Sequence, residues 1–329
     1  MKLIGKLISW LLGIVVGLAL VFGVFVLVVN AKYKINLFEV IGSLKKLNGN
    51  VDVAVIAPKA PTDDDYASAM TSANKAVAGI IVYDDESKEY SLNDSAKTGM
   101  TADLKLTDAE TCVLVNLMLK NGDAGVKFNA GGKDIDLKDY DFKLVQIALS
   151  NVAEKSADVN VVVSIDLTKL KNDMNNFPLN LLKNKVPQKL YVSSTVTVTK
   201  GDAPFEYTVA SKSLALNNMS GKEVSQLFNV VNLVAKIGTA DEFNEKLGKT
   251  FIDALIGNES NASGFAYSLK SIGASDFDFD TDGTNNYYVV RYASKGIWKF
   301  NIKKGVDTEN LSLLFVFFKL FRFFILVVN

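Results

Sequence analysis

Two long stretches of the chain alternate between hydrophobic and polar residues. The first runs from Val159 to Leu167, with Val162 as its one exception, and the second runs from Leu190 to Val198. A repeat of two residues is typical of a β-strand with one buried face. Lys200-Gly201-Asp202 predicts a turn into a further strand. Shorter runs predict more strands, at residues 51–55, 79–83, 205–216, 265–272, 277–280, 287–292 and 297–302.

Helices are predicted where a threonine or serine stands three residues before a glutamate. In such a capping box the hydroxyl and the carboxylate accept hydrogen bonds from the first free N–H groups of a helix. Thr107 with Glu110 predicts a helix to about Leu119, Ser220 with Glu223 one over 224–235, and Thr239 with Glu242 one more. The last of these carries an apolar stripe of Phe243, Leu247, Phe251 and Leu255. An alanine-rich helix is predicted at 67–78.

Long alternating strands and a few amphipathic helices predict an α+β fold, in which helices pack against a long, curled antiparallel sheet. The polar stretch from Asp84 to Gly99 is the best candidate for an internal boundary. We therefore expect four parts: a membrane anchor at 1–34, a small α/β region at 35–99, the antiparallel body at 100–305 and an apolar tail at 306–329.

The stretch from Leu7 to Val29 is apolar apart from its glycines and Ser9. As a helix it would extend about 34 Å, enough to cross a hydrocarbon core of about 30 Å. We expect a single-pass plasma-membrane anchor with its N-terminus inside and the body extracytoplasmic. Lysines flank the stretch on both sides, so the positive-inside rule favours neither orientation of the helix clearly. The alternative is a signal peptide cleaved near Val29-Asn30-Ala31, although its apolar core would be unusually long.

The tail from Leu311 to Asn329 is also almost wholly apolar, but Lys319 and Arg322 stand in its middle. If the tail formed a second membrane span, inserting both cations into the bilayer would cost about 5–7 kcal/mol of free energy. A helix lying on the membrane or against the body, or a sequencing artefact, remain the alternatives.

Composition excludes several function classes. The chain has no histidine, and its only cysteine is Cys112. Catalysis by Ser-His-Asp or Cys-His groups, an internal disulfide and a cysteine-rich zinc site are therefore excluded. Lysine plus arginine equals aspartate plus glutamate, at 36 each, which argues against nucleic-acid binding. We expect a non-enzymatic protein without a cofactor. Paired carboxylates of a glycan hydrolase remain a less favoured alternative.

One motif has the form of a metal site. Asp278, Asp280 and Asp282 alternate before Gly283, as in the first half of a calcium-binding loop. The twelfth position of such a loop, which should be glutamate, is Val289, and the flanking residues predict strands. A β-hairpin with an Asp-Gly turn accounts for the same residues.

The order of parts resembles a group of bacterial envelope proteins. The shared features are the N-terminal helix, Leu106-Thr107-Asp108-Ala109-Glu110, the 159–167 strand and the entry Val186-Pro187-Gln188-Lys189-Leu190-Tyr191. This order is similar to the YpmS-like proteins and, more remotely, to AsmA-like and TULIP-type lipid-binding folds. The resemblance covers roughly residues 1–235 and implies a role in lipid contact or envelope maintenance.

A curled sheet beside a bilayer could hold an acyl chain in an apolar trough. The residues expected to line it are Val159, Val161, Val163, Ile165, Val192 and Val196. The alternative is that these side chains fill an ordinary core. The partners that we expect are membrane lipid and, in the alternative function of a surface scaffold, another protein of the envelope.

Overall fold

The structure is a computed structural model that describes residues 45–93, 99–121, 127–130, 133–136, 141–173, 184, 186–235 and 238–293. The described residues all belong to one unit, Met1–Ala293. The predicted anchor at 7–29, the strand at 297–302 and the tail at 306–329 lie outside them. Of the helices described, none has the length and hydropathy to cross a membrane.

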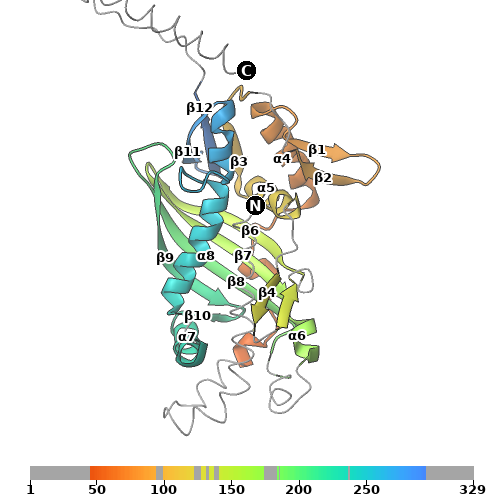
Figure 1. The fold of residues 1–329 in the computed structure, drawn as a ribbon, viewed down its shortest axis with the longest axis vertical. Coiled ribbons are helices and arrows are strands. Elements are labelled where there is room, and N and C mark those ends of the chain that lie inside the picture. Colours follow the sequence, from red (N-terminus) through yellow and green to blue (C-terminus); the bar gives the residue numbers. More distant parts are fainter. Residues whose placement is uncertain are drawn as a thin grey trace, which may run out of the picture. The chain divides into compact units, whose positions relative to one another are not determined.

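A five-stranded antiparallel sheet forms the larger part of the body (Figure 1). Its strands are β6 (Lys143–Ala153), β7 (Ser156–Asp166), β8 (Lys189–Lys200), β9 (Tyr207–Leu216) and β10 (Met219–Ser220), in the order β10-β9-β8-β7-β6. Both long alternating stretches are therefore strands, as predicted, and they pair with each other with Val159 opposite Val196. Strand β6 escaped prediction because its sequence has no alternation of period two.

Helix α8 (Ala240–Leu255) packs on one face of this sheet, against β8 and β9. The predicted capping box is present: Thr239 Oγ1 accepts from the N–H of Glu242, and Glu242 Oε2 accepts from the N–H of Thr239. Phe243, Leu247, Phe251 and Leu255 are all buried. The apolar stripe therefore faces the sheet, as expected for an amphipathic helix.

A second antiparallel sheet has the order β11-β12-β3. Strands β11 (Ala274–Thr281) and β12 (Asn286–Tyr292) form a hairpin, and β3 (Leu104–Thr107) pairs with β12. Helix α5 (Asp108–Asn121) follows β3 directly and packs on β6 and on helix α4 (Asp63–Ala76). The predicted Thr107–Glu110 capping box is present in both its hydrogen bonds.

The remaining elements lie around these two sheets. They are the hairpins β1 (Ile81–Asp84) with β2 (Glu89–Leu92) and β4 (Lys127–Ala130) with β5 (Lys133–Asp136), and the helices α6 (Thr168–Asp173) and α7 (Lys222–Ala235). The alanine-rich helix at 67–78 is α4, which begins four residues earlier than predicted.

Two predicted strands are wrong. Val53–Ile56 is a single helical turn, α3, whose start is capped by Asp52. Residues 265–272 form the short helix α9 (Phe265–Ser268) and the 3₁₀ turn η3 (Leu269–Ile272). In both places the apolar run is short, and a short run does not separate a helical period from a strand period.

The fold class is α+β, as predicted. The five-stranded sheet is open, with β10 and β6 at its edges. The curl that we expected is not present in the described strands.

Candidate functional site

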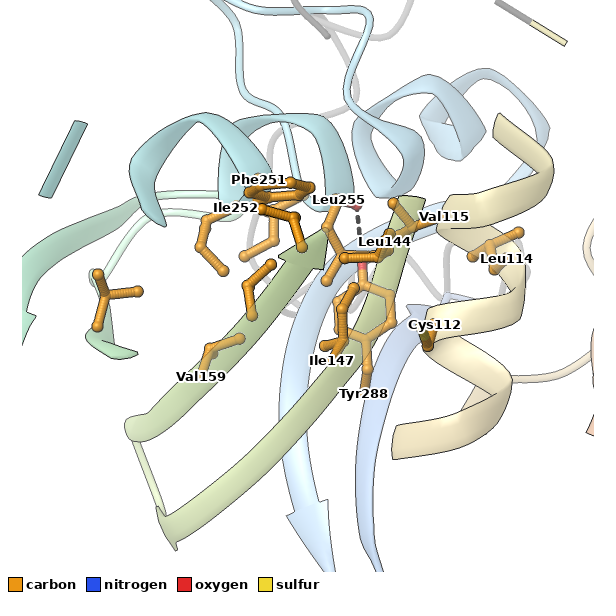
Figure 2. Close-up of a cluster of buried hydrophobic side chains, with 14 of the residues drawn as sticks. Cys112, Leu114, Val115, Leu144, Ile147, Val159, Phe251, Ile252, Leu255 and Tyr288 are labelled. Carbon is orange, nitrogen blue, oxygen red and sulfur yellow. Dashed lines mark hydrogen bonds between the residues drawn. The ribbon is translucent and has the colours of Figure 1, made fainter. Parts of the chain in front are cut away.

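The six residues expected to line a lipid trough lie in the hydrophobic core. Their exposed fractions are 0–2%, and all belong to one cluster of buried side chains. Figure 2 shows Val159 on the face of the sheet that lies beneath Phe251, Ile252 and Leu255 of α8. The space over this face is therefore filled by side chains of the protein itself.

Helix α8 contacts the sheet closely at Val196, one of these six residues. A Cβ atom placed on Gly248 of α8 would stand 2.8 Å from Val196 Cγ2 and 3.0 Å from Val196 Cβ. Real Cβ atoms essentially never approach other atoms that closely. Any larger residue at this position would force helix or strand to shift, so the two are in direct contact there.

Polar groups also join α8 to the sheet. Asn244, fully buried in α8, accepts a hydrogen bond from Ser194 Oγ at 2.7 Å. Its amide nitrogen donates to the carbonyl oxygen of Thr195 and to Ser211 Oγ, both at 2.9 Å. A buried amide with partners for both its oxygen and its nitrogen fixes one register between helix and strands.

The three aspartates of the proposed metal loop bind groups of the protein. Asp278 accepts hydrogen bonds from Arg291, the nearest at 2.9 Å, and Asp280 accepts one from Lys105 Nζ at 3.0 Å. The hydrogen bond from Lys105 lowers the pKa of Asp280. Two cations of the chain thus neutralise two of the three carboxylates.

Asp282 stabilises the turn of the β11–β12 hairpin. Its Oδ1 accepts from the N–H groups of Asn285 and Thr284, and its Oδ2 accepts from the hydroxyl of Tyr287. These hydrogen bonds, that of Asn285 first, lower its pKa to about 2. Gly283 has a φ of +87°, which glycine adopts readily. The alternative prediction, a hairpin with an Asp-Gly turn, is confirmed. No three Cys, Asp or Glu side chains in the described part of the chain could together hold a metal ion.

The opposite face of the five-stranded sheet carries a polar network. Asp158 accepts hydrogen bonds from Asn151, Thr197 and Lys212. Burial alone would raise the pKa of Asp158, but these three hydrogen bonds outweigh burial and lower it. The network has charge and hydroxyl groups but no histidine or thiol, and its carboxylate is already paired with an ammonium group.

Cys112 lies in the core beside Ile147 and Tyr288 (Figure 2). Burial raises the pKa of its thiol to about 12. A thiol of this kind stays protonated at neutral pH and is a poor nucleophile.

A surface that the sequence analysis did not single out lies on the β1–β2 hairpin. The ring of Tyr90 is 4.7 Å from that of Tyr83 and 5.6 Å from that of Tyr66, between ring centroids. Tyr83 and its neighbour Val82 are 39% and 38% exposed. Acidic residues flank the three tyrosines along the chain, namely Asp63, Asp64, Asp65, Asp84, Asp85, Glu86 and Glu89.

The sequence contains only a weak indication of this surface. Tyr83 and Tyr90 are seven positions apart, and they face each other only because the chain turns at 85–88. Tyr66 joins them only through the packing of α4, which no local pattern predicts.

The comparisons with known proteins give no relative: no family model, no curated protein and no solved structure matches this chain.

Proposed function

We propose that this chain is a non-enzymatic, membrane-anchored extracytoplasmic protein that acts as a scaffold by binding a protein partner at its outer surface. The observation that carries the proposal is the packing of α8 on the sheet. Val196 and Gly248 leave no room between them, so the apolar face serves the core. Binding is then a task for exposed side chains.

The tyrosine row is the exposed surface best suited to that task. Aromatic rings contribute large contact area at little cost in conformational entropy, and they are enriched in binding surfaces. Tyr83 and Val82 are exposed on a hairpin whose two strands are only four residues long each. Two of the seven acidic residues pair with lysines, Glu89 with Lys120 at 2.7 Å and Asp85 with Lys88 at 3.8 Å, and the acidic residues still outnumber these lysines.

The partner that fits this surface is a basic protein segment. Lysine and arginine are attracted both by carboxylates and by the faces of tyrosine rings. Placed on an extracytoplasmic body beside the membrane, such a surface would recruit a positively charged segment of another envelope protein.

Photocrosslinking in cells tests this proposal. A photoreactive residue at Glu86, which is exposed in the turn of the hairpin beside Tyr83, should trap a second protein, and mass spectrometry should place the crosslink in a segment rich in lysine or arginine. The matched control position is Glu259, which is exposed on a loop elsewhere in the body. Tyr83→Ser should reduce the crosslink several-fold and Tyr83→Phe should preserve it, because the ring and not the hydroxyl makes the contact.

Two results would oppose the proposal. Crosslinks from Glu86 that reach only other copies of the chain would remove the scaffold. The second result concerns lipid that co-purifies with the full chain. If a disulfide between α8 and the sheet removed this lipid, the result would favour a function in lipid binding or envelope maintenance. That function requires α8 to separate from β8 and β9.

A further inference from the structure

The described body begins at one end of the five-stranded sheet. Asn217, in the turn between β9 and β10, donates hydrogen bonds from Nδ2 to the carbonyl oxygens of Leu47 and Lys189, at 2.6 and 3.2 Å. Lys46 forms an ion pair with Glu223 at the start of α7. The first described residues are thus fixed to the sheet end where β9 finishes and β8 starts.

The strand register brings further residues to the same end. Asp166, the last residue of β7, lies opposite Lys189, and Lys143 of β6 lies opposite Ser164. Helix α6 follows β7 after one residue. Figure 1 shows α6, β10 and α7 at this end of the sheet.

Lysines predominate at this end, which we call the basic end. Among the residues that the structure describes, seven lysines belong to this end: Lys45, Lys46, Lys143, Lys169, Lys171, Lys189 and Lys222. The described acidic residues of the same end are Asp141, Asp166, Asp173 and Glu223. Two of these acids pair with lysines of the same end, in Lys46–Glu223 and Lys143–Asp141. A surplus of positive charge therefore remains.

The other end of the same sheet is different. Lys155 there pairs with Asp202 at 2.8 Å, and Lys200 pairs with Asp276 at 2.7 Å. Glu154 and Glu206 add further negative charge. The sheet thus carries opposite charge at its two ends, and the predicted anchor leads into the positive one.

We infer that the basic end docks on anionic lipid headgroups of the membrane that holds the anchor. The inference rests on the proposed anchor at 7–29. Residues 30–44 link the anchor to Lys45 and can extend at most about 50 Å. The linker therefore keeps the basic end within reach of the lipid surface, and each lysine near an anionic surface adds to the attraction. Docking would direct the acidic end away from the membrane.

The test uses the full chain in vesicles and two single-cysteine labels. Cys112 is buried and does not label, so Asn50→Cys reports on the basic end and Ala203→Cys on the opposite end. Each carries a nitrobenzoxadiazole group, whose emission rises among headgroups. The vesicles are phosphatidylcholine alone or with about one third phosphatidylglycerol. We expect a rise for Asn50→Cys only with anionic lipid, and its loss in about 0.5 M salt, since salt screens exposed charges.

Substitution separates specific charges from total charge. Replacing four lysines of the basic end by glutamine should lower the docked-to-free ratio about fivefold per lysine; these are Lys45, Lys171, Lys189 and Lys222. The matched control replaces four exposed lysines elsewhere, namely Lys75, Lys88, Lys246 and Lys270, and should leave docking unchanged.

The possible failures are distinguishable. A chain that does not float with either kind of vesicle lacks the anchor, and the proposed function then fails with the inference. If the chain floats with both kinds of vesicle but the emission of Asn50→Cys is equal in neutral and anionic vesicles, only the inference that the basic end docks on anionic lipid is overturned.

Discussion

Single residues decide how closely α8 approaches the sheet. Gly248 lets the helix backbone come within methyl-group distance of Val196, and Asn244 fixes the helix along the strands through three hydrogen bonds. A larger residue at 248 would hold helix and sheet apart, and a shift along the strands would leave a buried amide unpaired. The filled core therefore depends on two residues whose types are unremarkable in the sequence.

Gly248→Ala should lower the free energy of unfolding by about 1–2 kcal/mol, because overpacking against Val196, at up to about 3 kcal/mol, outweighs the helix propensity that alanine adds, about 1 kcal/mol. Urea unfolding followed by circular dichroism measures the change. Adding Val196→Ala should recover part of it, and a double-mutant cycle gives the coupling. The control is Glu245→Ala on the exposed face of α8, expected to stay near wild type. A Gly248→Ala protein as stable as wild type would contradict the close contact.

At the scale of elements, side chains protect the edge strand β6. An unprotected edge strand presents free N–H and C=O groups that pair with other chains. Here Asp108 accepts from the N–H of Leu149 at 2.9 Å, and Asn286 donates to the carbonyl oxygen of Leu149 at 2.7 Å. Asn116 of α5 donates to the carbonyl oxygen of Leu144 at 3.1 Å. Groups from α5 and β12 thus occupy the positions of a sixth strand.

Asp108→Ala should therefore destabilise the protein by about 1–3 kcal/mol, since it leaves the N–H of Leu149 without its acceptor. It also removes the ion pair between Asp108 and Lys59. Light scattering at rising protein concentration should show association of the variant. Asp108→Asn keeps an acceptor oxygen and is the matched control, which we expect to remain soluble. Equal association of both variants would show that the edge is protected by other means.

At the scale of the whole described body, one core joins the two larger sheets. Buried residues of α4, α5, α8 and both sheets belong to a single cluster. Tyr288 of β12, fully buried, donates its hydroxyl to the carbonyl oxygen of Leu255 at the end of α8, at 2.9 Å. The polar stretch 84–99, which we treated as a boundary, contributes β2 to the packing of α5. We expect these elements to unfold together.

Cys112 reports on this joint unfolding. Its thiol, with a pKa of about 12, should react with a disulfide reagent at pH 8 only when the core opens, so the rate should follow global unfolding in urea. The thiol ionises more readily in the unfolded chain, so its contribution to stability is present below about pH 8.5 and falls as the pH rises toward 12. Cys112→Ala should remove that part of the pH dependence.

Fast reaction of the Cys112 thiol with the disulfide reagent in buffer without urea would contradict the joint unfolding, because it would show that α5 opens by itself.

Local patterns in the sequence determined much of this fold. Strands β7 and β8 follow from alternation, β9 follows from the turn at 200–202, and α5 and α8 follow from capping boxes whose hydrogen bonds span three residues. The β11–β12 hairpin follows from its Asp-Gly turn. Such features need no distant partner. The strands predicted at 51–55 and 265–272 were wrong, because tertiary packing decides whether so short an apolar run forms a helix or a strand.

The nature of the candidate sites was decided by tertiary structure alone. The sequence shows that Val159 to Ile165 share an apolar face, but an open trough and a filled core have the same alternation. Gly248, 52 positions from Val196, packs directly against it, and all six side chains are buried in the core. Likewise, Asp280 is neutralised by Lys105, and Tyr66 completes the tyrosine row, only through strand pairing and helix packing. Contacts between residues far apart in the chain leave no periodic trace in the sequence, so only the folded arrangement reveals them.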